Sequence, residues 1–219
     1  MKKINRNKFF KQYPFRPLNQ MQVDNLNFIL DKLNASELLT RLSEYAYVLA
    51  TLKLETADTF APVEKAYWIR PESRRIAVLK KMYAGRKSII HPSGKLYTGR
   101  GYVQLTYIDN YIKMNRYVQE KFPEYDLVGN PGLACEPEAA WIILETGMSK
   151  GLFTGRKLSN YFTDNKHDFY NARKIINGLD RAGLVQAYAE KYWEVLGFED
   201  VKFRPFKNKK SGIKTALQK

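Results

Sequence analysis

Two glutamates, Glu55 and Glu64, stand on either side of a Phe-Ala-Pro sequence and could together perform acid–base chemistry. Cleavage of a glycosidic bond needs one protonated carboxyl to donate to the leaving oxygen and a second, ionised one to activate water or attack the sugar. Burial favours the protonated form, and helical geometry places Glu55 beside Val48 and Leu52 at the edge of an apolar stripe. Glu64 follows Pro62 in an expected loop, where water favours the ionised form. The chain has 22 acidic residues, so spacing alone favours the simpler interpretation of a solvated glutamate at a helix end.

Other kinds of catalytic centre find little support in the sequence. Cys135 is the single cysteine, and the two histidines, His91 and His167, are far apart, so no zinc-like ligand spacing is present. The sequence has no glycine-rich phosphate loop and no nucleophile with an adjacent base, and we expect no cofactor and no metal. One cysteine also excludes an intrachain disulfide and favours folding in a reducing cytoplasm. Carboxylate chemistry is the class that remains.

Helical patterns dominate the sequence around these residues. Residues 34–56 form the clearest predicted helix, with Asn34 and Glu37 in the positions of a capping box and leucines at helical spacing. The stretches "PEAAWIILETG" and "DFYNARKIINGLDRAGLVQAYAEKYWEVLG" predict further helices, with Gly147 and Gly197 as helix stops. Residues 88–99, "SIIHPSGKLYTG", predict a hairpin or a turn-rich wing. The expected fold class is mainly α (α+β), with a small β element.

The chain is strongly basic, since 37 Lys and Arg against 22 Asp and Glu give a net charge of +15. This balance predicts attraction to a polyanion, either nucleic acid or the phosphate-bearing polymers and anionic lipids of a bacterial envelope. No nucleic-acid-binding motif is present, so we expect no specific nucleic-acid partner. The length predicts one domain, residues 1–219, and we expect a monomer. Basic tails at residues 1–16 and 202–219 are either solvated termini or contacts to the envelope.

The N-terminus does not resemble a Sec signal, because Lys11 interrupts the apolar stretch that begins at Phe9 and Phe10. No run of about 18 apolar residues is present, so no membrane span is expected. A target outside the cytoplasm would therefore have to be reached with the help of another agent.

Two motifs of the chain resemble those of a known enzyme family. "AYVLATLKLETADTFAPVEK" and "YTGRGYVQLTYIDNY" are similar to the two core motifs of glycoside hydrolase family 19, the chitinase-like lysozymes, and most closely to its bacteriophage endolysin branch. The similarity extends outward from "PLNQMQVDNLNFILDKL" to "ARKIINGLDRAG" and so covers most of the chain. The resemblance implies a lysozyme-like fold, mainly α-helical, with a small β wing beside the catalytic cleft.

Carried over to this sequence, the resemblance makes Glu55 the general acid and Glu64 the general base of an inverting glycosidase. It gives the Thr106 hydroxyl a part in holding the attacking water. The residues that it assigns to substrate binding carry amide or hydroxyl groups: Gln104, Asn110, Tyr111 and Asn177. Amides and hydroxyls are suited to this task because sugars present hydroxyl and acetamido groups.

Several residues near the motifs have alternative roles. Asp58 is a rival to Glu64 for the second carboxylate. Gly99 and Gly101 serve a tight backbone path, and Arg100 is expected to pair with a core carboxylate. The family usually has His directly before its catalytic Glu, whereas this chain has Leu54. That departure leaves room for a chain that keeps the fold with weakened catalysis.

The resemblance implies a peptidoglycan hydrolase, an endolysin with muramidase (lysozyme) activity. Such an enzyme cuts the glycan strand between N-acetylmuramic acid and N-acetylglucosamine and causes bacterial cell lysis. Chitin is an alternative substrate, because both glycans contain N-acetylglucosamine, and a non-catalytic glycan-binding or virion structural protein is a second alternative. The expected partner is bacterial peptidoglycan, reached from the host cytoplasm through holin-dependent release or on a phage particle.

Overall fold

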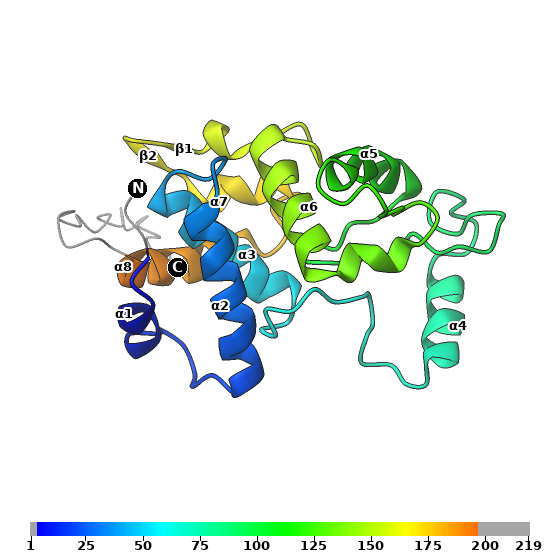
Figure 1. Ribbon diagram of the computed structural model, residues 1–219, viewed down its shortest axis with the longest axis horizontal. Coiled ribbons are helices and arrows are strands. Elements are labelled where there is room, and N and C mark those ends of the chain that lie inside the picture. The colour runs from blue at the N-terminus through cyan, green and yellow to red at the C-terminus, as the bar shows by residue number, and fades with distance from the viewer. Residues whose placement is uncertain (1–3, 197–219) are drawn as a thin grey trace, which may run out of the picture.

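Helix α3 (Leu42–Glu55) runs through the centre of the molecule and ends at one of the two candidate carboxylates (Figure 1). The computed structural model describes residues 4–196 of the chain. Residues 43–53 of α3 are all buried, as is typical of a helix that is surrounded by core on every side. Helix α8 (Ala182–Leu196) packs along α3. The hydroxyl of Tyr47 on α3 donates a hydrogen bond of 2.7 Å to the carbonyl of Ala172. The candidate acid is therefore attached to a rigid, buried element.

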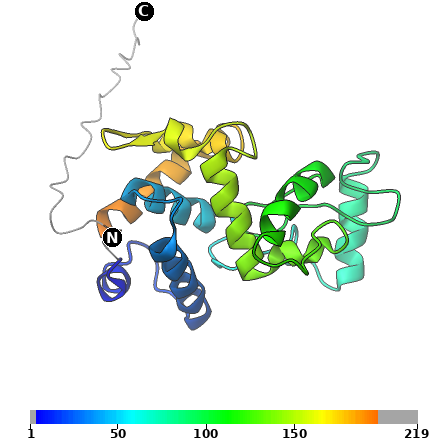
Figure 2. The same cartoon turned by 45° about the horizontal axis from the view of Figure 1, so that its top comes forward.

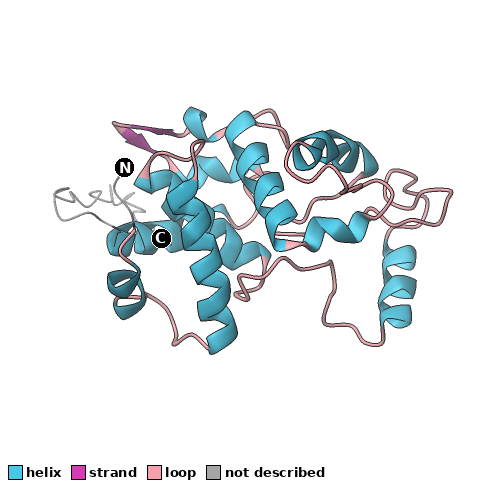
Figure 3. Ribbon diagram, viewed as in Figure 1, coloured by secondary structure: helices cyan, strands magenta, loops and turns pink. Residues whose placement is uncertain are grey.

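The other elements are mostly helical (Figure 3). The helices are α1 (Arg6–Lys11), α2 (Gln20–Ala35), α4 (Glu72–Met82), α5 (Ile108–Gln119), α6 (Pro137–Lys150) and α7 (Phe169–Ala172), with short 3-10 turns η1 (Pro131–Cys135), η2 (Leu158–Asn160) and η3 (Arg173–Ile175). Helix α4 lies at the end of the molecule away from α3 (Figure 3). Strands β1 (Phe162–Thr163) and β2 (Lys166–His167) form one antiparallel pair. The predicted fold class, mainly α with a small β element, is confirmed. None of the helices within residues 4–196 combines the length and apolarity needed to cross a membrane.

The predicted helix over residues 34–56 is wrong at its start. Helix α2 continues through Asn34, and the chain then turns before α3 begins at Leu42. The Asn34 amide oxygen accepts a hydrogen bond from the Ile4 backbone and caps nothing. A glutamate does mark the true helix start, because Glu44 accepts hydrogen bonds from the backbone N–H groups of Thr40 and Arg41. The periodic pattern holds from Leu42 onward, whereas Leu38, its first leucine, lies in the break between the helices and is 44% exposed.

Of the two alternatives for residues 88–99, the turn-rich wing is confirmed and the hairpin is not. Residues 88–99 form a turn-rich segment whose pairing is limited to one isolated bridge, between Ile90 and Leu96. The true two-stranded sheet lies between α6 and α7, with Phe162 opposite His167 in register. The wing at 88–99 has Pro, Ser and Gly at its tip, which favour a turn over a ladder.

Gly147, predicted to stop a helix, lies inside α6, which continues to Lys150. The helix ends instead at Gly151, in the left-handed conformation with φ of 73°. Packing explains the glycine at position 147, because a Cβ added there would overlap with the Phe153 ring. Gly197 and the basic tail at 202–219 lie outside the described residues.

The N-terminal segment is part of the fold and not the tail that the sequence predicts. Residues 6–11 form α1, and Phe9 is 0% exposed. The Phe15 ring packs edge-on against Tyr188, with ring centroids 5.3 Å apart. The Lys53 ammonium lies 4.2 Å from the centroid of the same Phe15 ring. The N-terminal segment thus packs against the C-terminal end of α3 through the contact between Phe15 and Lys53.

Replacement of Phe9 by Ala should therefore destabilise the protein by about 3–5 kcal/mol, because it opens a cavity in a fully buried site. The measurement is the free energy of unfolding from urea denaturation. Lys11→Ala, on the exposed end of the same helix, is the control and should change stability by less than about 0.5 kcal/mol. Equal effects of the two changes would show that the segment is a loose tail after all.

Candidate functional site

Glu55 is the last residue of α3, and the threonine after it fixes the direction in which the chain leaves the helix. The fully buried Thr56 hydroxyl donates to the Leu52 carbonyl (2.7 Å) and accepts from the Phe60 N–H (2.9 Å). The Glu55 side chain is 15% exposed. Its carboxyl group is thus held at the edge of the core, with one face toward solvent.

Arg173 is the charged partner of Glu55, and the sequence did not predict it. Its Nη1 atom lies 2.6 Å from Glu55 Oε1, and its side chain is 4% exposed. Its Nε donates to the Asp180 carbonyl at 3.0 Å, which fixes the plane of the guanidinium. Glu55 was expected beside apolar groups alone, and the structure adds a buried cation. No hydrogen bond to Glu55 Oε2 is found within residues 4–196, so this oxygen is available to a ligand.

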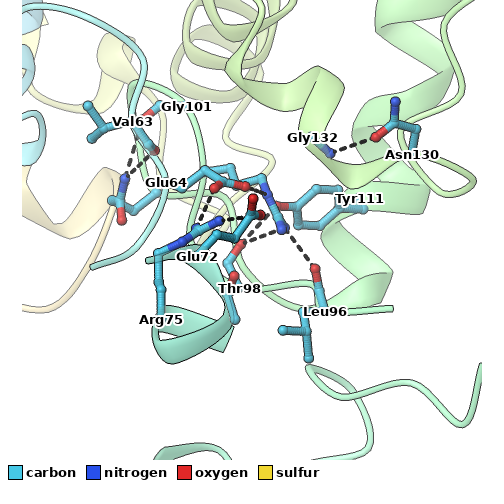
Figure 4. Close-up of polar contacts among 12 residues, drawn as sticks. Val63, Glu64, Glu72, Arg75, Leu96, Thr98, Gly101, Tyr111, Asn130 and Gly132 are labelled. Atoms are coloured by element: carbon cyan, nitrogen blue, oxygen red, sulfur yellow. Dashed lines mark hydrogen bonds and ion pairs between the residues drawn. The ribbon is translucent and has the colours of Figure 1, made fainter. Parts of the chain in front are cut away.

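Glu64 is held by two arginines (Figure 4). Arg100 Nε donates to Glu64 Oε1 at 2.7 Å, and Arg75 on α4 forms an ion pair with Glu64 Oε2. The Glu64 side chain is 27% exposed, whereas both arginine side chains are nearly buried. Burial raises the pKa of the Glu64 carboxyl, but the hydrogen bonds and charges of Arg100 and Arg75 outweigh it, so the pKa lies below its ordinary value. The expected pairing of Arg100 with a carboxylate is seen here; Arg75 was not predicted.

The turn that carries Arg100 is tied to the loop that carries Glu64. The Gln104 side-chain amide donates to the Val63 carbonyl at 3.0 Å, and the Lys65 N–H donates to the Gly99 carbonyl at 2.7 Å. A Cβ at Gly99 would lie 2.8 Å from Gln104 Oε1. At Gly101, with φ of +76°, a Cβ would lie 2.6 Å from a backbone oxygen. The two glycines therefore permit the tight path that the sequence suggested.

Three of the predicted substrate or water contacts retain partly exposed side chains: Gln104, Thr106 and Asn110. The Thr106 hydroxyl donates to the Gln104 carbonyl, and the Asn110 amide donates to the Thr106 carbonyl, both at 2.8 Å. Each of these bonds runs from a side chain to a backbone carbonyl, so the turn itself orients the Thr106 and Asn110 side chains. Asn177 is exposed, and its amide oxygen accepts from the Gly178 N–H. Because the Asn177 N–H donates to the Arg173 carbonyl, Asn177 stands in the same turn as the partner of Glu55.

Tyr111 was predicted to contact the sugar, but its side chain is 0% exposed. The prediction of a direct contact is therefore wrong. Its hydroxyl donates to the Thr98 carbonyl at 2.8 Å and accepts from Arg100 Nη1 at 3.2 Å. The ring belongs to the core behind the site, and its hydroxyl helps to orient Arg100 toward Glu64. An aromatic residue in a motif can serve either role, and only burial distinguishes them.

Asp58, the rival second carboxylate, is also ion-paired. Its Oδ1 lies 2.5 Å from the Lys53 ammonium, and its Oδ2 lies 3.1 Å from Arg16. Asp58 therefore joins the N-terminal segment to the end of α3. Asp58 and Glu64 thus each join two or more segments of the chain through ion pairs, and the contacts alone do not distinguish their chemical roles.

Other chemistries lack the groups that they need within residues 4–196. No cluster of three or more His, Cys, Asp or Glu side chains is arranged to hold a metal ion. Burial raises the pKa of the Cys135 thiol to about 11, against the opposing effect of a hydrogen bond with the Gly101 backbone. A thiol with this pKa is a poor nucleophile near neutral pH.

Comparison with known proteins bears on the fold. No protein-family model and no curated protein matches the chain. Among solved structures, the chain is similar to chitinase C from Streptomyces griseus, with a TM-score of 0.53 and 18% sequence identity. The match covers 88% of this chain and 76% of that one. It shows that the chain shares the fold of this chitinase, in agreement with the mainly α, lysozyme-like fold that the resemblance implied.

The ion pairs of Glu64 predict a specific dependence of stability on pH. Because the folded pKa of Glu64 is lowered, its ionised form stabilises the fold above the unfolded pKa of about 4.3, and this contribution is lost as pH falls through the folded pKa. Glu64→Gln should therefore cost about 2 kcal/mol of unfolding free energy near pH 7, and the deficit should shrink toward about pH 3.

Urea denaturation of both proteins across this range measures the deficit. Glu72→Gln is the matched control, because Glu72 also contacts Arg75 but is 68% exposed; its effect should be small at every pH. A Glu64→Gln deficit that stays constant with pH would contradict the assignment.

Proposed function

We propose that this protein is a glycoside hydrolase that cuts the glycan strand of peptidoglycan between N-acetylmuramic acid and N-acetylglucosamine. The observation that carries the proposal is the placement of Glu55, a largely buried carboxyl at the end of α3, held through one oxygen by Arg173. Support comes from the fold shared with chitinase C and from the second carboxylate in the following loop. We further propose that it acts as an endolysin of the bacteriophage type, released from the host cytoplasm or carried on a particle.

Glu55 is the general acid of the proposed reaction. Arg173 binds Oε1, so Oε2 can face the glycosidic oxygen and deliver the proton to it as the bond breaks. The arginine then faces the carboxylate that the reaction leaves behind and stabilises its charge. Water attacks the sugar carbon from the opposite face, which inverts the configuration.

Glu64 is the general base in this proposal. A base must be ionised before it can take a proton from water, and the lowered pKa of Glu64 keeps it ionised at neutral pH. The same lowering makes it a weaker base, so Arg75 and Arg100 have to loosen their hold as the proton is transferred. The Thr106 hydroxyl, in contact with the Gln104 carbonyl, is the group that we assign to the attacking water.

Chitin is the alternative substrate, and the likeness to a chitinase favours it. A non-catalytic glycan-binding or virion structural protein is the other alternative, favoured by Leu54 in the place of the family histidine. Leu54 is partly buried and packs against the core, so it offers the site no polar group. The products formed from each glycan decide among these possibilities.

The deciding experiment incubates the wild type and Glu55→Gln with purified peptidoglycan and with chitin, reduces the products with borohydride and identifies the new sugar ends by mass spectrometry. Wild type should produce muramitol ends, and Glu55→Gln should produce them about 10²–10⁴-fold more slowly, because general acid catalysis is lost. Ends from chitin alone would favour the chitinase. If neither glycan gave new sugar ends, the hydrolase proposal would be wrong, and the non-catalytic glycan-binding or virion structural protein would remain.

The identity of the base is tested by Glu64→Gln and Asp58→Asn on the same substrate. We expect Glu64→Gln to lower kcat by about 10²-fold or more, whereas Asp58→Asn should mainly lower stability, because Asp58 binds Lys53 and Arg16. Both rates are measured at a temperature where circular dichroism shows each variant folded. The reverse pattern would make Asp58 the base.

A further inference from the structure

Positive charge is concentrated in one segment that begins directly after Glu64. Residues 65–95, here called the cationic arm, contain nine Lys and Arg and a single acid, Glu72. The arm therefore holds more than half of the net charge of +15 in about a seventh of the chain. It comprises the loop after Glu64, helix α4 and the tip of the turn-rich wing.

The cations of the arm are largely unpaired. Glu72 contacts Arg75, which is itself bound to Glu64. For the other eight cations of the arm, no ion pair is found within the part of the chain that the structure describes. Elsewhere, Arg41 and Arg173 have acidic partners, whereas Lys121 and Arg156 have no ion pair within the described residues. What sets the arm apart is that only one acid, Glu72, lies among its nine cations. Like charges at close range repel one another and destabilise the folded state, so the fold does not account for this concentration of charge.

Helix α4 presents its cations outward. Arg75 and Leu79 are the buried residues of α4. Residues 74, 77 and 81 lie on the opposite face by helical geometry, and Arg74, Lys80 and Lys81 are exposed. Figure 2 shows α4 at the end of the molecule farthest from α1, with open space on its outer side. Between Arg74 and Lys81 the outer face carries Ala77, and Met82 at the end of α4 is the one large apolar side chain of this helix that is exposed, at 53%. A single methionine is too little apolar surface to insert a helix into a lipid layer.

The arm is continuous with the candidate catalytic site. Arg75 reaches from α4 to the Glu64 carboxylate, and Lys65 is bonded through its N–H to the turn that carries Arg100. Trp68, four residues after Glu64, is 68% exposed and can cover the apolar face of a sugar ring. A glycan strand bound at Glu64 would therefore continue onto the arm.

We propose that the cationic arm binds the carboxylates of the stem peptides along a peptidoglycan strand. This inference rests on the proposed function, and it narrows the substrate to an anionic glycan. Stem peptides bring carboxylates to the strand at regular intervals, whereas chitin is uncharged. Charge complementarity with eight unpaired cations thus favours peptidoglycan over chitin for this site.

The test uses the full-length chain in the Glu55→Gln background, so that the glycan is bound and not cut. The arm variant replaces Arg74, Lys80 and Lys81 by Gln. The control variant replaces Lys11, Arg156 and Lys157 by Gln, which removes the same charge from exposed positions outside the arm. Sedimentation measures binding to peptidoglycan stripped of its attached phosphate polymers, and to chitin, at increasing salt.

The arm variant should bind stripped peptidoglycan about tenfold more weakly than the control at low salt, and the difference should vanish at high salt. All three proteins should bind chitin equally. Equal binding of peptidoglycan by the arm and control variants would overturn the proposal. The same comparison is made with unstripped walls, duplex DNA and anionic vesicles. If the arm variant bound more weakly than the control only to one of these, the proposal would also be overturned, because the arm would then bind another polyanion.

Failure of the inference and failure of the proposed function give different results. Suppose that the wild type produces muramitol ends but that the arm variant binds peptidoglycan as well as the control does. This result would support the proposed hydrolase activity and contradict the proposed binding role of the cationic arm. Arm-dependent binding without muramitol ends would keep an anionic glycan as the ligand and reject the catalytic role.

Discussion

The double ion pair of Glu64 is the interaction on which the site depends. One carboxylate joins three segments: its own loop, helix α4 through Arg75, and the turn after the wing through Arg100. Both guanidiniums are nearly buried, and a buried cation without a counterion is strongly destabilising. Each of the three groups is therefore held in place by the other two. Leu79 is the one fully buried apolar residue of α4. The ion pair between Arg75 and Glu64 is therefore a main contact that holds α4 to the rest of the protein.

The second carboxylate is held on the same principle but by a different part of the chain. Glu55 ends the most buried helix, and Arg173 reaches it from the turn between α7 and α8. The cation is fixed in turn by the Asp180 carbonyl. Because Arg173 binds Glu55, whereas Arg75 and Arg100 bind Glu64, the two carboxylates are anchored independently. Both oxygens of Glu64 have guanidinium partners, whereas Arg173 contacts one oxygen of Glu55.

Charge serves two purposes in this molecule. Around α3 and the N-terminal segment, cations are neutralised locally, as Lys53 is by Asp58 and the Phe15 ring. On the cationic arm, the cations other than Arg75 have no acidic partners within the described residues. The same net charge thus divides into a part that stabilises the fold and a part that remains available to an anionic ligand.

The sequence by itself determined the helical class, the position of Glu55 at a helix end, and the tight turn built on Gly99 and Gly101. These are local properties, because periodicity and backbone freedom involve residues close together in the chain. The tertiary structure alone decided that Arg75 and Arg173 are the partners of the two carboxylates and that Tyr111 is buried behind the site. It also decided that Ile4 and Phe9 of the N-terminal segment belong to the core. Such contacts join residues that are far apart in the chain, as Glu55 and Arg173 are at 118 positions. No local pattern can reveal them, since they exist only once packing brings the segments together.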